Sequence, residues 1–119
     1  MQDFKKLKVW EKSHAMVLQV YKVTKQYPKE ELFGLSSQLR RSAVSVPSNI
    51  AIGCCRGSEA DFKRFLQIAM GSASEVEYQI MLSNDLDYIE TNEFLTMQES
   101  VQEVKRMLAA LITKLKAEN

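Results

Sequence analysis

The sequence predicts an all-α protein, an antiparallel up-down-up-down four-helix bundle with a proline-kinked second helix. Four segments place apolar residues at helical spacing, and the last of them repeats as a heptad. The 119 residues contain only 4 glycines and 2 prolines, which indicates few breaks and long elements. Four long helices with short connections are typical of such a bundle, and no strand pattern competes with it. The length suits one domain over residues 1–119.

The C-terminal segment carries the clearest pattern. Its apolar residues recur at alternating spacings of 3 and 4, which is the a/d stripe of a helix packed in a bundle. The stripe consists of Phe94, Met97, Val101, Val104, Leu108, Leu111 and Leu115. Thr91 is the predicted N-cap, because its hydroxyl can accept a hydrogen bond from a free first-turn N–H.

The preceding helix is predicted to open at Ser58, with Asp61 favourable in its first turn, and to end near residues 86–89. One apolar stripe consists of Phe62, Phe65, Ala69, Ala73, Val76 and Ile80, and a second flank of Leu66, Met70 and Met81. A helix that is apolar over so much of its girth needs neighbours on more than one side. The small residues at 69–74 allow another backbone to approach closely.

The first helix is predicted over about residues 7–27, because Pro28 disfavours helix at the residue before it. Its expected inward residues are Trp10, His14, Val17, Leu18 and Tyr21. His14, the only histidine, is expected to be a partly buried packing residue.

The remaining helix has one apolar and one mostly polar face. Leu35, Leu39, Ala43, Val46, Ile50 and Gly53 form the apolar face, and Gln38, Arg41, Ser45, Asn49, Ile52 and Arg56 form the other. Pro47 should kink this helix and free the carbonyl of Ala43, or else break it into two shorter helices. The polar face is a candidate surface for subunit or partner contact at Gln38, Arg41, Ser45, Asn49 and Ile52.

Several functional classes have no support in the sequence. One histidine supplies neither a metal site nor a charge relay, and no phosphate loop or nucleophile elbow is present. The close carboxylates of the third helix are expected to be solvated charges. We therefore expect no enzyme activity, no cofactor and no metal. No segment has the apolar length of a membrane span or signal peptide, and two adjacent cysteines, Cys54 and Cys55, fit a reducing cytoplasm.

Charge is distributed unevenly although the net charge is only +1. Residues 1–72 carry 12 Lys/Arg against 6 Asp/Glu, a balance of +6, and residues 73–119 carry 4 against 9, a balance of −5. The up-down topology brings a basic set to one end, the candidate nucleic-acid-binding residues Lys5, Lys6, Lys8, Lys12, Arg56, Lys63 and Arg64. Such an end would attract phosphate, although a solubility pattern without a ligand explains it equally well.

Three stretches together resemble a known family. They are FKKLKVWEKS, YPKEELFGLSSQLRRSAVSVPSNIAIG and FKRFLQIAMGSASEVEYQI. In combination they are similar to the four-helix-bundle proteins named after intervening sequences of large-subunit ribosomal RNA, some of which are filed as ribosomal proteins. Accessory proteins of diversity-generating retroelements, which assist a reverse transcriptase, look similar. The family pattern usually has a glutamate where this chain has Ile52, so the polar contact made there by relatives is in doubt here.

The resemblance implies a cyclic homo-oligomer, with a pentamer favoured, and the broad apolar girth of the third helix fits assembly. The leading functional hypothesis is a non-catalytic nucleic-acid-binding accessory protein that acts with ribosomal RNA or a reverse transcriptase, on RNA or DNA. The alternative is a structural or adaptor oligomer that binds a protein partner. An enzyme is the third and weakest hypothesis.

Overall fold

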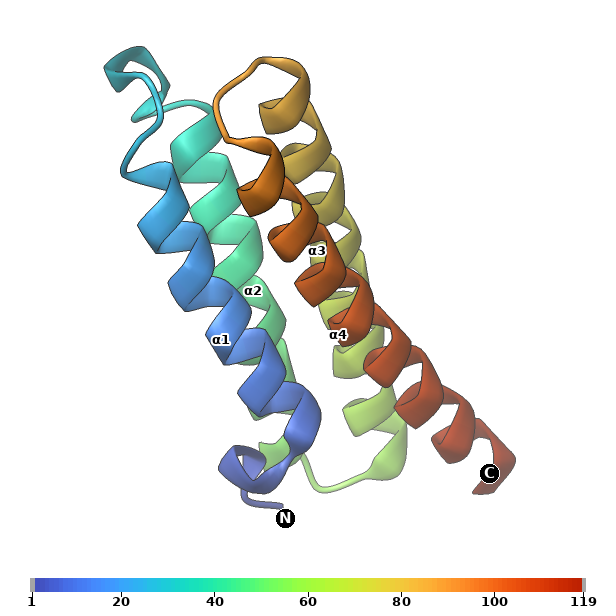
Figure 1. Cartoon of the computed structure of the whole chain (residues 1–119). Coiled ribbons are helices and arrows are strands. Elements are labelled where there is room, and N and C mark those ends of the chain that lie inside the picture. Colours follow the sequence, from blue (N-terminus) through green and yellow to red (C-terminus); the bar gives the residue numbers. More distant parts are fainter. Residues whose placement is uncertain (1, 119) are drawn as a thin grey trace.

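The computed structural model describes residues 2–118 as a bundle of four long helices (Figure 1). The helices are α1 (Lys8–Thr24), α2 (Leu35–Cys55), α3 (Glu59–Asp85) and α4 (Thr91–Glu118), and short 3-10 turns lie at Phe4–Lys6 (η1) and Lys29–Glu31 (η2). No strand occurs within residues 2–118. The predicted all-α four-helix bundle is confirmed. Figure 1 shows each helix running back along the one before it, in a rod of 46 × 23 × 20 Å.

The four helices stand at the corners of a square in chain order. Helix α1 packs against α2 and α4, and α3 packs against the same two helices. Helices α1 and α3 therefore occupy diagonal corners, with the apolar core between all four. It follows that the outer face formed by α1 and α2 lies opposite the outer face formed by α3 and α4.

The heptad stripe of α4 lies in the core, as predicted. Met97, Val101, Val104 and Leu108 are buried, and so is Leu115, the last residue of the stripe. The predicted N-cap was wrong by one residue. Thr91 is already helical, and the carbonyl of the preceding Glu90 accepts the first helical hydrogen bond from the Phe94 N–H at 2.9 Å.

The N-cap of α4 is Glu90 rather than Thr91 because the Glu93 side chain satisfies the backbone N–H of Glu90. The Glu93 carboxylate accepts a hydrogen bond from the Glu90 N–H at 3.4 Å. This is the glutamate half of a capping box, in which the third helical residue reaches back to the cap residue. Helix α4 thus begins on a carboxylate contact rather than on the Thr91 hydroxyl.

Helix α3 begins as predicted, because the Ser58 hydroxyl accepts from the Asp61 N–H at 3.1 Å. It ends at Asp85, one residue before the predicted range, and Asp87 then takes a left-handed φ of 61° in the turn to α4. The main stripe is buried throughout. Of the second flank, Leu66 is buried and Met70 half-buried, but Met81 is exposed.

The predicted inward face of α1 was wrong for most of its residues. Val17 is buried and Trp10 half-buried, whereas His14, Leu18 and Tyr21 are exposed. The core stripe is instead Val9, Ser13, Met16, Val20, Val23 and Thr24. It includes two hydroxyl residues because each donates to a carbonyl of its own helix, Ser13 to Trp10 at 2.9 Å and Thr24 to Val20 at 2.8 Å. Such internal bonds let Ser and Thr be buried in a helix.

Helix α1 also ends earlier than predicted, at Thr24 rather than Tyr27. The Gln26 and Tyr27 N–H groups donate to carbonyls three residues back, Val23 at 3.1 Å and Thr24 at 3.2 Å. The last turn before Pro28 is therefore tightened rather than α-helical, a common way to satisfy the last free carbonyls of a helix.

Pro47 lies inside α2, which runs without interruption from Leu35 to Cys55. The alternative of two shorter helices is therefore wrong. Pro47 itself is buried. The kink at this residue stays a prediction. Within the described residues, no helix combines the length and hydrophobicity that crossing a membrane requires.

The connection between α1 and α2 is joined to the connection between α3 and α4 by one carboxylate. Glu31 accepts from the Leu35 N–H in the first turn of α2 at 2.9 Å, and from the Tyr88 hydroxyl at 2.9 Å. These bonds hold the pKa of the Glu31 carboxyl below its usual value, the backbone bond from Leu35 having the larger effect. Loops separated by 57 residues are thereby fixed to each other.

Replacing Glu31 with alanine should therefore lower stability at neutral pH more than in acid. A carboxyl whose pKa is depressed by folding stabilises the native state above its unfolded pKa, and that contribution is lost as the pH falls through the folded value. We expect the difference in urea midpoint between wild type and Glu31→Ala to be largest near pH 7. It should shrink steadily below about pH 4. Glu30→Ala, an exposed neighbour, is the control, and an equal loss from both variants at neutral pH would contradict the assignment.

Candidate nucleic-acid interface and subunit contacts

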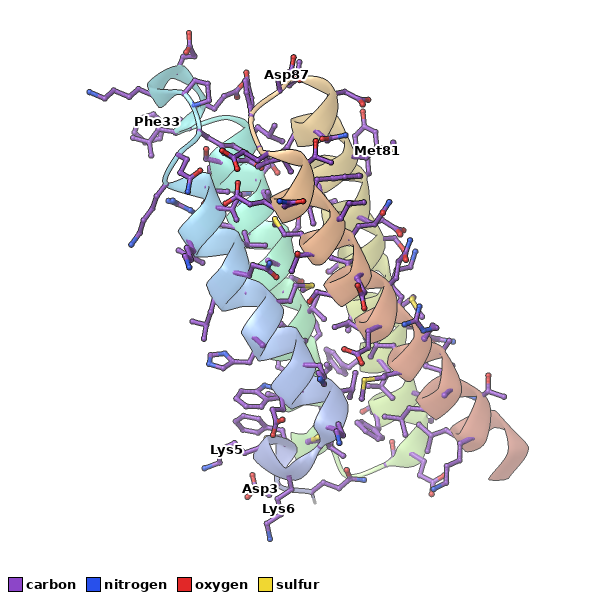
Figure 2. All side chains as sticks on the ribbon, viewed as in Figure 1. Asp3, Lys5, Lys6, Phe33, Met81 and Asp87 are labelled. Atoms are coloured by element: carbon purple, nitrogen blue, oxygen red, sulfur yellow. The ribbon has the colours of Figure 1, made fainter. Side chains whose placement is uncertain are left out.

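The predicted basic residues lie at one end of the rod. They come from η1, the first turns of α1, the C-terminus of α2 and the first turns of α3. Figure 1 shows these segments together at the end that carries the N-terminus, and Figure 2 places Asp3, Lys5 and Lys6 at its tip. We call Lys5, Lys6, Lys8, Lys12, Arg56, Lys63 and Arg64 the basic end.

The N-terminal segment of this end is held in place by several contacts. The Gln2 N–H donates to the carbonyl of Cys54 in α2 at 3.4 Å, and the Asp3 carboxylate accepts from the Lys5 N–H at 3.1 Å. The Phe4 ring packs edge-on against the Trp10 ring, with centroids 5.1 Å apart. These contacts fix the η1 backbone to both α1 and α2, so its lysines project from an ordered support.

The cations of the basic end differ in how freely they face solvent. Lys5, Lys6 and Lys8 are exposed and make no ion pair within the described residues. Lys12 lies 3.7 Å from Glu103, and Arg64 lies 3.6 Å from Asp61. Exposed pairs of this length contribute only about 0–1 kcal/mol, so they restrain these two side chains weakly.

Two guanidinium groups flank one aromatic ring at this end. Arg56 and Arg64 lie over the ring of Phe65, at 5.0 and 4.5 Å from its centroid. Phe65 is itself buried, and it links the end of α2 to the start of α3. A cation–π contact orients an arginine without neutralising it. Both arginines are therefore restrained in position by the ring, and Arg64 is in addition paired with Asp61. Lys63, which lies between them in sequence, is half-buried.

The candidate contact face on α2 contains two hydrogen-bonded, half-buried residues and three exposed ones. Ser45 and Asn49 are half-buried. The Ser45 hydroxyl bonds the Ser72 hydroxyl of α3 at 2.8 Å, and the Asn49 amide donates to the Ser45 carbonyl within α2 at 2.8 Å. Gln38, Arg41 and Ile52 are exposed. The role of this face in subunit or partner contact stays a prediction. Within the subunit, Ser45 joins α2 to α3, and Asn49 is bonded to Ser45 of its own helix.

Arg40 and Arg41 are neighbours with different surroundings. The Arg40 guanidinium donates to the Thr24 hydroxyl at 2.8 Å and lies 5.0 Å from the centroid of the Tyr21 ring. Arg40 therefore joins α2 to α1, a role that the sequence did not reveal because the two partners are 16 and 19 positions away. Arg41 is exposed and leaves its charge on the surface.

Other candidate groups have ordinary surroundings. His14 is exposed and stacks on Trp10, with centroids 5.1 Å apart and planes 7° apart, so the expectation of partial burial was wrong. Cys54 is buried and Cys55 exposed, and both thiols are free. Burial raises the pKa of the Cys54 thiol, which keeps it protonated and unreactive at neutral pH.

The fold and these surfaces define a small helical-bundle protein with a cluster of basic residues at one end. The chain belongs to the 23S rRNA-intervening sequence protein family, whose model matches residues 5–110. The resemblance drawn from the sequence motifs is thereby confirmed for this family, and the family name connects it with ribosomal RNA.

A solved structure is similar over most of the chain. It is the crystal structure of a protein of unknown function from the S23 ribosomal protein family of Bacteroides thetaiotaomicron. The identity is 28% and the TM-score 0.81, and the alignment covers 87% of this chain and 97% of the other. No curated protein gave a significant match.

Proposed function

We propose that this protein is a non-catalytic, homo-oligomeric nucleic-acid-binding accessory protein linked to ribosomal RNA. The observation that carries the proposal is the clustering of the basic end, where Lys5, Lys6 and Lys8 project from a fixed support into solvent. Membership of the rRNA intervening-sequence family supports the choice of nucleic acid over other anions.

The basic end binds the phosphate backbone and does not read bases. Lysine and arginine contacts to phosphate position a protein on nucleic acid but carry no sequence information. Each phosphate that is neutralised releases condensed counterions, so affinity falls steeply as salt rises. In a ring of parallel subunits the basic ends add together on one rim, which offsets the small net charge of +1 for each chain.

Charge reversal at the basic end tests this proposal. We expect Lys5→Glu combined with Lys6→Glu to weaken binding of a fluorescent RNA duplex by about tenfold or more at low salt. The plot of log affinity against log salt should become shallower by roughly 2, because two phosphate contacts are lost. These lysines suit the test better than Lys63 and Arg64, which are half-buried or stacked on Phe65.

The control is Lys25→Glu combined with Lys29→Glu, which removes the same charge from the opposite end. Fluorescence anisotropy is measured with RNA and DNA, and light scattering verifies that each variant keeps the wild-type mass. Equal losses from both double variants, or no binding by the wild type at low salt, would refute the proposal. The adaptor oligomer that binds a protein such as a reverse transcriptase would then become the leading function.

A further inference from the structure

The first two turns of α1 carry a pair of stacked aromatic side chains. The imidazole of His14 lies almost parallel to the indole of Trp10, with centroids 5.1 Å apart and planes 7° apart. Both side chains belong to α1 and are one turn apart, so their stack joins no two elements of the fold. His14 is exposed and Trp10 half-buried. The pair therefore presents an aromatic surface to solvent that packing of the bundle does not require.

An open hollow of about 350 Å³ adjoins this pair between α1 and α2. Its walls are mostly apolar and include no lysine, arginine or carboxylate. The lining residues are Trp10, His14, Val17, Val44, Pro47, Ser48 and Ala51. An apolar, aromatic wall with few polar groups suits a flat heteroaromatic ring, whereas a charged group would lose hydration there without gaining a partner.

The exposed lysines of η1 lie beside the aromatic pair. Phe4, the first residue of η1, packs against Trp10 with ring centroids 5.1 Å apart, and Lys5 and Lys6 follow it in the same turn. Cations that attract phosphate beside rings on which bases stack are the combination by which proteins hold single strands. A duplex satisfies only the cations, because its bases are paired and stacked on one another, whereas the bases of loops and ends are free to stack on a protein.

We infer that Trp10 and His14 form a stacking site for an unpaired base of single-stranded RNA, whose phosphates lie on Lys5 and Lys6. This inference rests on the nucleic-acid binding in the proposed function and names the class of ligand, an unpaired strand, loop or end. Every base has a π-face, so stacking adds affinity without reading sequence. The site therefore distinguishes single strands from duplexes, while the basic end still binds phosphate without regard to the bases.

Two RNA oligonucleotides of equal length test the inference, one with uracil at every position and one with the same backbone but no bases. We expect the wild type to bind the uridine strand at least about fivefold more tightly, the gain from one stacked base. Trp10 is the only tryptophan, so its fluorescence reports this site directly and should be quenched by the uridine strand alone. His14→Ala should lose most of the preference but keep the salt dependence, because Lys5 and Lys6 remain.

Tyr78→Ala is the matched control. Tyr78 is an exposed aromatic residue of α3, the helix diagonal to α1, and its removal should leave the preference for the uridine strand intact. Circular dichroism should show the same helix content for both variants, since both changed side chains are exposed. Equal binding of the two strands by the wild type, an intact preference in His14→Ala, or equal losses from both variants would overturn the stacking site and leave the phosphate contacts standing. No binding of either strand at low salt would refute the proposed function and the stacking site together.

Discussion

Replacement of Leu66 with alanine should lower the free energy of unfolding by about 2–5 kcal/mol, the range for truncating a fully buried leucine. Leu66 is 0% exposed and belongs to the hydrophobic core of the bundle. Removal of its side chain deletes buried methyl groups and leaves a cavity that the rigid α3 backbone cannot fill. Urea unfolding followed by circular dichroism measures the loss, at one protein concentration for all variants.

The control lies two residues further on the same helix. Ile68 is 41% exposed, so Ile68→Ala removes a similar hydrocarbon volume without opening a buried cavity. We expect a loss below about 1 kcal/mol, which is ordinary for surface substitutions. Similar losses of unfolding free energy at both positions would contradict the orientation of α3, in which Leu66 faces the core and Ile68 faces solvent.

The core-facing side of a helix could be predicted from sequence where that helix carries a single apolar stripe. Helix α4 has a single heptad stripe, and its core residues were all found in advance. Helix α1 has two apolar stripes, and the one with Trp10 and Tyr21 was predicted to face inward. In the structure the stripe with Met16 and Val20 is buried instead. Which of the two apolar faces of α1 is enclosed depends on how the other helices pack against it.

The basic end could also be predicted only in part, because the sequence pattern gives the order of the helices but not the contacts between side chains of different helices. The up-down order of helices was enough to bring the lysines of η1 and the arginines of α2 and α3 to one end. The stack of Arg56 and Arg64 on Phe65 and the bond from Arg40 to Thr24 depend on side-chain positions across helices, which periodicity does not encode. Likewise, the exposure of Phe33 follows from the path of one loop.

Replacement of Ala73 with leucine should destabilise the subunit by about 1–3 kcal/mol, because it overfills a close helix contact. Ala73 and Ala69 are fully buried in α3, and the bond between Ser45 and Ser72 shows that α2 lies directly against this part of α3. The small residues at 69–74 were predicted to let another backbone approach closely. Within the subunit, Ser72 of this run contacts Ser45 of α2, and a role of the exposed members in subunit contact stays a prediction.

Gly71, within the same run, provides the contrast. A side chain there would meet nothing within 4 Å, and Gly71 is exposed. Since glycine is a poor helix former, Gly71→Ala should raise the free energy of unfolding by about 0.5–1 kcal/mol. Urea unfolding of Ala73→Leu and Gly71→Ala, together with light scattering on Gly71→Leu, separates the alternatives. If the small residues form a seam within the subunit, Ala73→Leu loses stability and Gly71→Ala gains it, and Gly71→Leu keeps the wild-type mass. If they form a contact between subunits, Gly71→Leu reduces the mass of the assembly, because its bulk blocks the approach of the neighbouring chain.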